Sequence, residues 1–126
     1  MAESIVVMME DLLFLSKIME TAKAIDVKVV RGDAQGGKAA LRDAQPQAII
    51  LDLNSRTLPA VELIQSLKAD PATRPIRIVG FVSHVQEELI SAARAAGCDS
   101  ILTRSAFTKR LPELLRTLAT GSDEFT

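Results

Sequence analysis

Tryptophan and tyrosine are absent from this 126-residue chain, and cysteine and histidine occur once each. The lone cysteine, Cys98, has no partner for an internal disulfide. One cysteine and one histidine also cannot supply the four ligands of the usual Cys/His zinc sites. The missing tryptophan and tyrosine would have been useful for stacking a flavin. The composition therefore disfavours disulfide-stapled, zinc-binding and flavin-binding proteins.

Neither sign of charge predominates in the chain. It has 15 Lys and Arg residues against 16 Asp and Glu residues, with a net charge of -1. The two signs are interspersed, so the sequence has neither the basic stripe that binds phosphate backbones nor a cationic face for a membrane surface. We therefore expect neither nucleic acid nor a membrane as a partner.

Long apolar runs are also missing, since none approaches the roughly 18 residues that a membrane-spanning helix requires. Residues 1–4 lack the charged start and apolar stretch of a secretion signal, which favours a cytoplasmic protein. The length and a hydrophobic content of 48% predict one domain over residues 1–120. Residues 121–126 are expected to be a frayed tail, with no output domain of the chain's own.

What the chain does have is a regular alternation of two hydrophobic patterns. Five short runs rich in branched apolar residues predict buried parallel strands at Ile5–Met8, Val27–Val30, Ala48–Leu53, Ile76–Val82 and Ser100–Thr103. Helical spacing separates them, with apolar faces such as Leu15, Ile18, Met19, Ala22 and Ile25 in the first helix. A further helix is expected from about Leu111 to Ala119. The alternation predicts an α/β domain with right-handed crossovers.

Asp52 is the most informative single residue, because it ends the most apolar short run, Ala48–Leu51. A carboxylate at the end of a buried strand is costly without a partner or a task. Polar residues also follow the other strands: Glu10 and Asp11, then Ser83, then Arg104. Because ligands of parallel sheets gather beyond the carboxyl ends of the strands, we expect these side chains to form one rim.

Three stretches of the sequence are similar to one known family. Asp52 stands at the end of the third strand, residues 68–74 look like the loop before the fourth strand, and residues 92–99 look like the approach to the fifth. In these features the chain resembles the response-regulator receiver domains. The resemblance implies a flavodoxin-like (βα)5 three-layer sandwich with a five-stranded parallel sheet of order 2-1-3-4-5. It also implies a role in phosphorelay-type, two-component signal transduction.

The resemblance further implies a phosphorylation site. In the family, an acidic pair after the first strand and the phosphoacceptor aspartate hold Mg²⁺, which demands oxygen ligands in octahedral geometry. Asp52 matches the phosphoacceptor, and the metal ligands would be Glu10, Asp11 and Asp52. A lysine after the fifth strand and a hydroxyl after the fourth stabilise the phosphoryl charge in the family.

The sequence departs from the family at most of those positions. Met8 and Met9 stand where the acidic pair belongs, and thioethers are poor Mg²⁺ ligands. Arg104 replaces the lysine. Val82 occupies the hydroxyl position and Ser83 follows it, so without a bulge the Ser83 hydroxyl is expected to face away from Asp52. These departures indicate a degenerate, pseudo-receiver-like member.

Three accounts of the rim remain open. In the first, Asp52 and Arg104 form a partly buried structural ion pair, and the domain acts without phosphorylation. In the second, Asp52 is phosphorylated, Glu10 or Asp11 helps to hold Mg²⁺, and Arg104 stands in for lysine. In the third, Arg104 and Ser83, together with Ser105, bind a small anion or a cofactor on a flavodoxin-like scaffold.

The function expected from this reasoning is signalling by protein contact rather than catalysis, without a cofactor of its own. By the resemblance, the partner surface comprises the fourth helix, the fifth strand and the fifth helix. Its candidate residues are Gln86, Arg94, Phe107 and Arg110. The same face could also form a homodimer. The alternative for Phe107 is packing in the core.

Overall fold

The computed structural model of the chain describes residues 5–32, 37–83 and 86–120. Its five strands are β1 (Ile5–Met8), β2 (Val29–Arg31), β3 (Ala48–Asp52), β4 (Arg77–Val82) and β5 (Ser100–Thr103). The helices are α1 (Leu12–Ala24), α2 (Gly37–Ala44), α3 (Ala60–Ala69), α4 (Glu87–Ala96), α5 (Arg104–Lys109) and α6 (Leu111–Thr120). The tail predicted for residues 121–126 lies outside the described residues.

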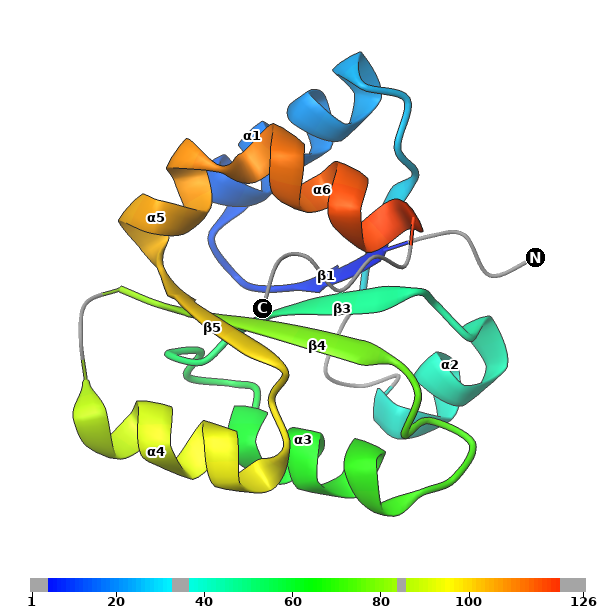
Figure 1. Cartoon of the computed structure of the whole chain (residues 1–126), viewed down its shortest axis with the longest axis vertical. Helices are drawn as coiled ribbons and strands as arrows, with labels where there is room; N and C mark the ends of the chain where they lie inside the picture. Colours follow the sequence, from blue (N-terminus) through cyan, green and yellow to red (C-terminus); the bar gives the residue numbers. More distant parts are fainter. Residues whose placement is uncertain (1–4, 33–36, 84–85, 121–126) are drawn as a thin grey trace.

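The strands form one parallel sheet of order β2-β1-β3-β4-β5 (Figure 1). The flavodoxin-like α/β fold predicted from the sequence is therefore confirmed. In the centre, β1 pairs with β3 and β3 with β4, so that Asp52 lies opposite Phe81. β1, β3 and β4 are almost wholly buried, as their continuous apolar runs predict.

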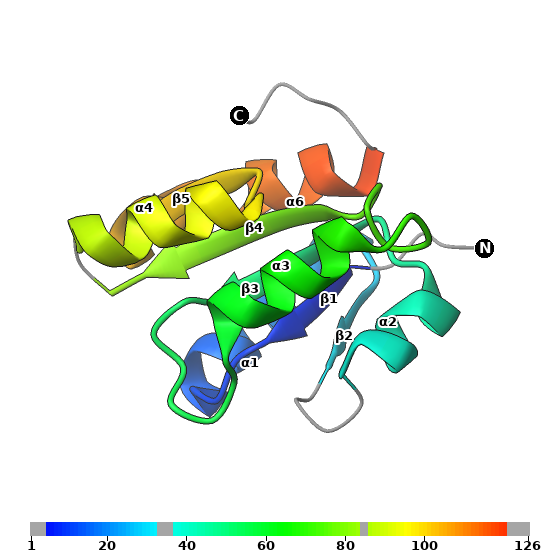
Figure 2. The ribbon, with the colours of Figure 1, turned by 90° about the horizontal axis from the view of Figure 1, so that it is seen from below.

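Two apolar cores lie on the two faces of the sheet. One core packs α1, α5 and α6 against side chains such as Val7, Ile50 and Val79. The other packs α2, α3 and α4 against the alternate strand residues, including Ile49, Leu51 and Ile78. Figures 1 and 2 show these two helical layers on opposite sides of the sheet. None of the described helices is long and apolar enough to cross a membrane.

The ends of two helices follow local sequence signals. Asp11 caps α1, since its side chain accepts a hydrogen bond from the backbone N–H of Phe14 at 3.1 Å. Gly97 ends α4 in the left-handed conformation, with φ of 112°. An added Cβ there would lie 2.8 Å from the Lys68 side chain, which is a second reason for glycine.

Some boundaries predicted from the sequence were wrong. β2 begins at Val29 rather than Val27, because the turn after α1 places Asp26 at positive φ and ties the N–H of Val27 back to Ala22. Met19, assigned to the buried face of α1, is 37% exposed. The short helix α5 was not predicted, although the Thr103 side chain caps it by accepting from the N–H of Ala106.

Candidate functional site

The carboxyl ends of the strands surround an open hollow of about 310 Å³. Its lining comes from the carboxyl-terminal ends of β3 and β4 and from the segments after β1, β3, β4 and β5. The lining residues are Glu10, Asp11, Asp52, Asn54, Arg56, Phe81, Ser83 and Arg104. We call this region the rim hollow. Glu10, Asp11, Asp52, Ser83 and Arg104, all predicted for the rim from the sequence, therefore line one hollow, whereas Ser105 is not among its lining residues.

Asp52 is half-buried at the end of β3 and accepts a hydrogen bond from the backbone N–H of Asn54 at 2.9 Å. Burial raises its pKa above the ordinary value, and the carboxylates of Glu10 and Asp11 raise it further. The Asn54 hydrogen bond and the charge of Arg104 oppose this rise without overcoming it. Asp52 is thus a carboxylate whose charge is poorly compensated.

Arg104 does not form an ion pair with Asp52. The Asp52–Arg104 pair of the first account was therefore wrong. The guanidinium instead pairs with the carboxylate of Asp11, and it lies 4.5 Å from the centre of the Phe14 ring. Since Arg104 begins α5 and Asp11 caps α1, this contact joins the two helices at the rim. The N–H of Phe14 and the guanidinium of Arg104 both lower the pKa of Asp11.

Glu10 is hydrogen-bonded to the loop between β3 and α3. The hydroxyl of Thr57 donates to its carboxylate, and the backbone N–H of Arg56 donates to Oε1 at 3.3 Å. The hydrogen bond from Thr57 is the main reason that the pKa of Glu10 lies below its usual value. Glu10 therefore has partners of its own in this arrangement.

These contacts bear directly on the predicted Mg²⁺ ligands. Glu10 and Asp11 are each engaged elsewhere, and Met8 and Met9 at the end of β1 are buried. Within residues 5–32, 37–83 and 86–120, no three acidic, His or Cys side chains are placed to hold a metal ion together. The donor set does not fit Mg²⁺ in this arrangement, because thioethers and committed carboxylates leave too few oxygen ligands.

Ser83 follows β4 directly and is one of the residues that line the rim hollow. The direction of its hydroxyl relative to Asp52 stays a prediction. The pairing of β4 with β5 is continuous from Val79 to Val82, without a bulge. Val82 itself is buried in the opposite core. The backbone N–H of Ser83 donates to the side chain of Asn54 at 2.9 Å.

Asn54 is a site residue that the sequence reasoning missed. It is the chain's single asparagine, and it follows Asp52 by two residues. Its side chain bonds to the backbone of Ser83 and also donates to Gln86 Oε1 at 2.6 Å. The isolated amide in a turn was the available signal, because asparagine favours such positions by hydrogen-bonding nearby backbone.

The predicted partner residues separate into one buried and three surface positions. Phe107 is fully buried among Phe14 and Phe81, with ring centres 5.4 to 5.5 Å away, so its assignment to the surface was wrong. The alternative, packing in the core, accounts for the position of Phe107, because a fully buried aromatic ring stabilises the fold through the apolar surface that it buries. Arg94 in α4 and Arg110 before α6 are exposed, whereas Gln86 at the N-cap of α4 is half-buried.

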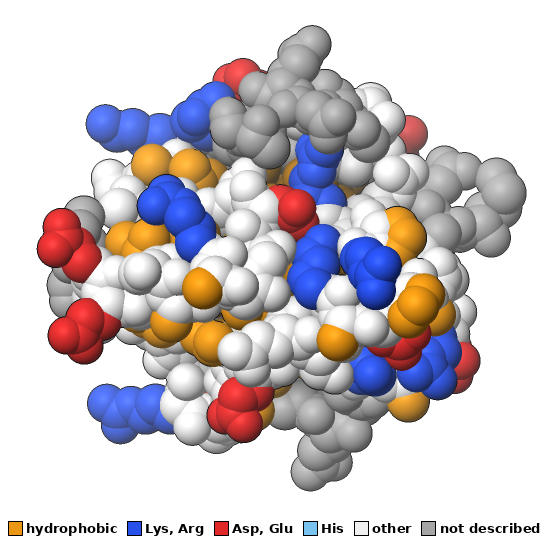
Figure 3. Space-filling view, turned by 60° about the horizontal axis from the view of Figure 1, so that its bottom comes forward, with side chains coloured by type: hydrophobic (Ala, Val, Ile, Leu, Met, Phe, Trp, Pro, Cys, Tyr) orange, Lys and Arg blue, Asp and Glu red, His pale blue; other side chains and the backbone are white. Residues whose placement is uncertain are grey.

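Arg94 and Arg110 border a shallow hollow of about 260 Å³ over β5. Its lining also includes Ile101 and Leu102 of the edge strand β5, both half-buried. Figure 3 shows one face of the molecule, on which acidic and basic side chains alternate with small apolar patches. That face carries no broad single-sign field, in agreement with the interspersed charges of the sequence.

We compared the sequence and the structure of the chain with those of known proteins. The sequence matches no protein-family model. It is 25% identical over 111 residues to the transcriptional regulatory protein MctR of Rhizobium johnstonii, a match that covers 88% of this chain and 51% of that protein. The chain therefore spans about half the length of the curated relative that it matches.

Solved structures are similar over nearly the whole chain. The phosphorylated cyanobacterial phytochrome response regulator RcpA superposes with a TM-score of 0.76 at 21% identity, covering 94% of this chain and 91% of that one. A response regulator from Thermotoga maritima superposes with a TM-score of 0.74 at 14% identity, covering 95% and 99%. The chain has the fold of response-regulator receiver domains.

Proposed function

We propose that this chain is a receiver-like signalling domain that acts through protein contacts without phosphorylation of Asp52. The fold and the distant similarity to a transcriptional regulator support the signalling part of the proposal. The observation that carries the phosphorylation-independent part is the commitment of the neighbouring carboxylates. Asp11 is held by a helix N-terminus and Arg104, and Glu10 by the loop between β3 and α3.

Those commitments matter because phosphoryl transfer to a carboxylate needs charge compensation. Mg²⁺ supplies it only if two or three oxygen ligands converge, and Arg104 supplies it only if the guanidinium is available. Here each group would have to leave a hydrogen-bonded partner first. These contacts favour a domain whose surface is recognised by a protein partner without phosphorylation of Asp52.

Phosphorylation of Asp52 is the second candidate, and one observation favours it. Asp52 is half-buried, has a raised pKa and faces an open hollow that also contains Ser83 and Arg104. A small-anion site is less well supported. The described residues that line the hollow include three carboxylates and two guanidinium groups, so their summed charge repels an anion.

The partner surface that we propose contains Gln86, Arg94 and Arg110 and excludes the buried Phe107. The test is a pull-down of the cognate protein with purified variants. Arg94→Glu should weaken capture without lowering the thermal stability. Arg110→Glu should also weaken capture, with a small loss of stability because Arg110 pairs with Glu113. Asp52→Asn should leave capture unchanged. The proposal would be contradicted if Asp52→Asn abolished capture while the two arginine variants did not. The partner would then recognise the Asp52 carboxylate.

Magnesium provides an independent test of the same proposal. The midpoint of thermal unfolding should be the same in Mg²⁺ and in a chelator, because the rim carboxylates do not converge on a metal position. A rise in the midpoint with Mg²⁺ that disappears in Asp52→Asn would show that the carboxylates do assemble, and it would favour the second candidate.

A further inference from the structure

A second hollow shares Glu10 with the rim hollow and extends to the end of β2. Its volume is about 120 Å³, and we call it the β2 hollow. Its lining residues, all within the described ranges, are Met8, Met9, Glu10, Arg31, Gly32, Ser55, Thr57 and Leu58. Among these residues, Arg31 is the single cation and Glu10 the single anion. Without the Glu10 side chain, this lining would carry a net positive charge.

The carboxylate of Glu10 meets hydrogen-bond donors of the loop between β3 and α3. The hydroxyl of Thr57 donates to Oε2, and the backbone N–H of Arg56 donates to Oε1 at 3.3 Å. These two donors lower the pKa of Glu10, the Thr57 hydroxyl most, and the hydroxyl of Ser55 and the N–H of Thr57 lower it further. Three consecutive residues therefore place donors around one carboxylate.

The loop has contacts of its own that hold these donors in place. The N–H of Ser55 donates to the carbonyl of Asp52 at 3.3 Å, and the N–H of Leu58 donates to Ser55 Oγ at 3.1 Å. Because Ser55 Oγ accepts from Leu58, its hydroxyl hydrogen is left to donate elsewhere. The Leu58 side chain is buried in the core that α3 covers. The loop is therefore ordered by contacts that do not involve Glu10, and its donors are preorganised for a carboxylate.

We propose that the loop Ser55–Thr57 and Arg31 form a binding site for a small carboxylate, and that Glu10 occupies this site from within the chain. The two oxygens of Glu10 receive separate donors, an arrangement that a planar carboxylate fits. The guanidinium of Arg31 supplies charge-assisted hydrogen bonds to a ligand in the hollow. The β2 hollow is smaller than the roughly 300 Å³ of pockets for drug-sized molecules, so the ligand is a short acid.

Glu10 competes with such a ligand because it belongs to the same chain. Its binding is intramolecular, so a free carboxylate must overcome the effective concentration of the tethered side chain. Removal of the Glu10 carboxylate should therefore open the site. The inference goes beyond the proposed function, because it requires neither a protein partner nor Asp52. Either of the two can fail while the other stands.

The experiment is NMR of the full chain, with acetate as the probe. In Glu10→Ala, the backbone amide signals of Arg56 and Thr57 should shift, because their acceptor is gone. Sodium acetate should return both signals towards their wild-type positions, with half-saturation on the order of 10 mM for a ligand of so few atoms. In the wild type, the same acetate should leave these signals unchanged, because Glu10 holds the site.

Matched variants separate binding at this site from general effects of the salt. Glu62→Ala removes an exposed acidic residue of α3, and acetate should not shift the amide signals of Arg56 and Thr57 in that variant. In the double variant Glu10→Ala, Arg31→Gln, half-saturation should need at least about five-fold more acetate, the factor that corresponds to one hydrogen bond of ordinary net strength. Sodium chloride at the same ionic strength should restore neither signal.

Glu10→Gln gives a graded version of the same test. Its side chain keeps the length of glutamate but has one acceptor oxygen instead of two. This variant should therefore need more acetate than Glu10→Ala for the same return of the Arg56 and Thr57 signals.

The inference is overturned if acetate fails to return these signals in Glu10→Ala, or if it returns them equally well after Arg31→Gln. It is also overturned if the wild type responds to acetate as strongly as Glu10→Ala, because Glu10 would then not occupy the site.

Discussion

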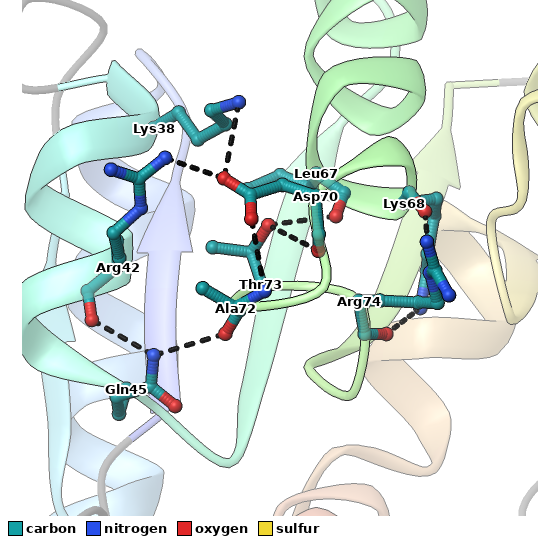
Figure 4. A network of polar contacts seen from close by, with 9 residues as sticks. All are labelled: Lys38, Arg42, Gln45, Leu67, Lys68, Asp70, Ala72, Thr73 and Arg74. Atoms are coloured by element: carbon teal, nitrogen blue, oxygen red, sulfur yellow. Dashed lines mark hydrogen bonds and ion pairs between the residues drawn. The ribbon is translucent and has the colours of Figure 1, made fainter.

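Asp52 and Asp70 are two aspartates at opposite ends of the sheet, and their surroundings differ. Asp52 ends β3, whereas Asp70 follows α3 in the loop that leads to β4. Figure 4 shows the Asp70 side chain pointing from this loop toward Lys38 and Arg42 of α2. Lys38 Nζ lies 3.3 Å and Arg42 Nη2 2.5 Å from Asp70 Oδ2. The N–H of Ala72 donates to Oδ1 at 2.9 Å. Asp52 has one such backbone bond and no ion pair with a described residue.

The two pKa values move in opposite directions as a result. The N–H of Ala72, followed by Arg42, lowers the pKa of Asp70 from 3.8 to about 2. Burial raises the pKa of Asp52, with help from two neighbouring carboxylates. Asp70 thus belongs to a satisfied structural network. A carboxylate such as Asp52, which is partly buried and poorly compensated, is the kind of group that marks a functional position.

The largest effect is expected from the loop around Asp70. The Thr73 hydroxyl is fully buried and donates to the carbonyl of Leu67 at 2.7 Å (Figure 4). Thr73→Val should lower the free energy of unfolding by about 2 kcal/mol, because the buried carbonyl loses its donor. The measurement is urea denaturation.

The matched control lies at the rim. Thr57 also donates through its hydroxyl, to Glu10, but it is exposed. Thr57→Val should change the free energy of unfolding by less than about 1 kcal/mol, because water can replace the bond. Equal losses of unfolding free energy in Thr73→Val and Thr57→Val would contradict the contrast between the buried loop around Asp70 and the solvent-exposed rim.

A smaller effect is expected from Asp70→Asn, and it should depend on pH. Because the folded pKa of Asp70 is depressed, its charge stabilises the fold above pH 3.8, and this contribution is lost as the pH falls towards about 2. Denaturation curves should therefore show a weaker acid dependence for the variant than for the wild type over that window. Parallel acid profiles for the two proteins would contradict the assignment of Asp70 to the ionic network.

Arg104→Ala should have a modest effect on stability. The guanidinium and its partner Asp11 are each 39% exposed, so the loss should be about 1 kcal/mol or less. The same substitution should raise the pKa of Asp52 further, because the charge of Arg104 lowers that pKa. NMR titration of the Asp52 carboxyl carbon measures this shift, with Lys109→Ala as a control from the exposed side of α5.

A loss of several kcal/mol in Arg104→Ala would contradict this account. It would mean that the guanidinium compensates a buried carboxylate, as in the structural pair that the sequence suggested for Asp52.

The smallest effect on stability is expected for Asp52→Asn, and its sign is opposite to that of Asp70→Asn. A raised folded pKa means that the contribution of Asp52 to stability is fully present below pH 3.8 and is lost as the pH rises through the folded pKa of Asp52. At neutral pH the variant should be as stable as the wild type or slightly more stable, by less than about 1 kcal/mol. A clear loss of thermal stability in Asp52→Asn at neutral pH would show that the charge of the Asp52 carboxylate is compensated in the folded protein.

Most of the fold could be predicted from the sequence because its signals are local and repeated. Continuous apolar runs such as Ala48–Leu51 indicate strands buried on both faces, and Gly97 marks a helix end. The start of β2 and the six-residue helix α5 were missed because tertiary contacts and a single cap determine them. Short elements carry too few residues for a period to be recognised.

Five residues of the candidate site were predicted from the sequence, but Asn54 was missed and the contacts were predicted only in part. The residues that follow the strands could be assigned to one rim, because parallel strands bring their carboxyl ends to the same edge. Which cation pairs with which carboxylate depends on side-chain reach across two loops. Arg104 reaches Asp11 at the start of α1, and Asn54 reaches Gln86 at the start of α4. No local sequence pattern predicts either contact, because the paired residues are far apart in the chain.

The most direct test of the central claim is the intact mass of the protein after incubation with Mg²⁺ and acetyl phosphate, for the wild type and for Asp52→Asn. The account predicts no phosphoryl adduct on either protein, because Glu10, Asp11 and Arg104 are held by other partners. An adduct that forms on the wild type alone, and only with Mg²⁺, would contradict it and would establish Asp52 as a phosphoacceptor.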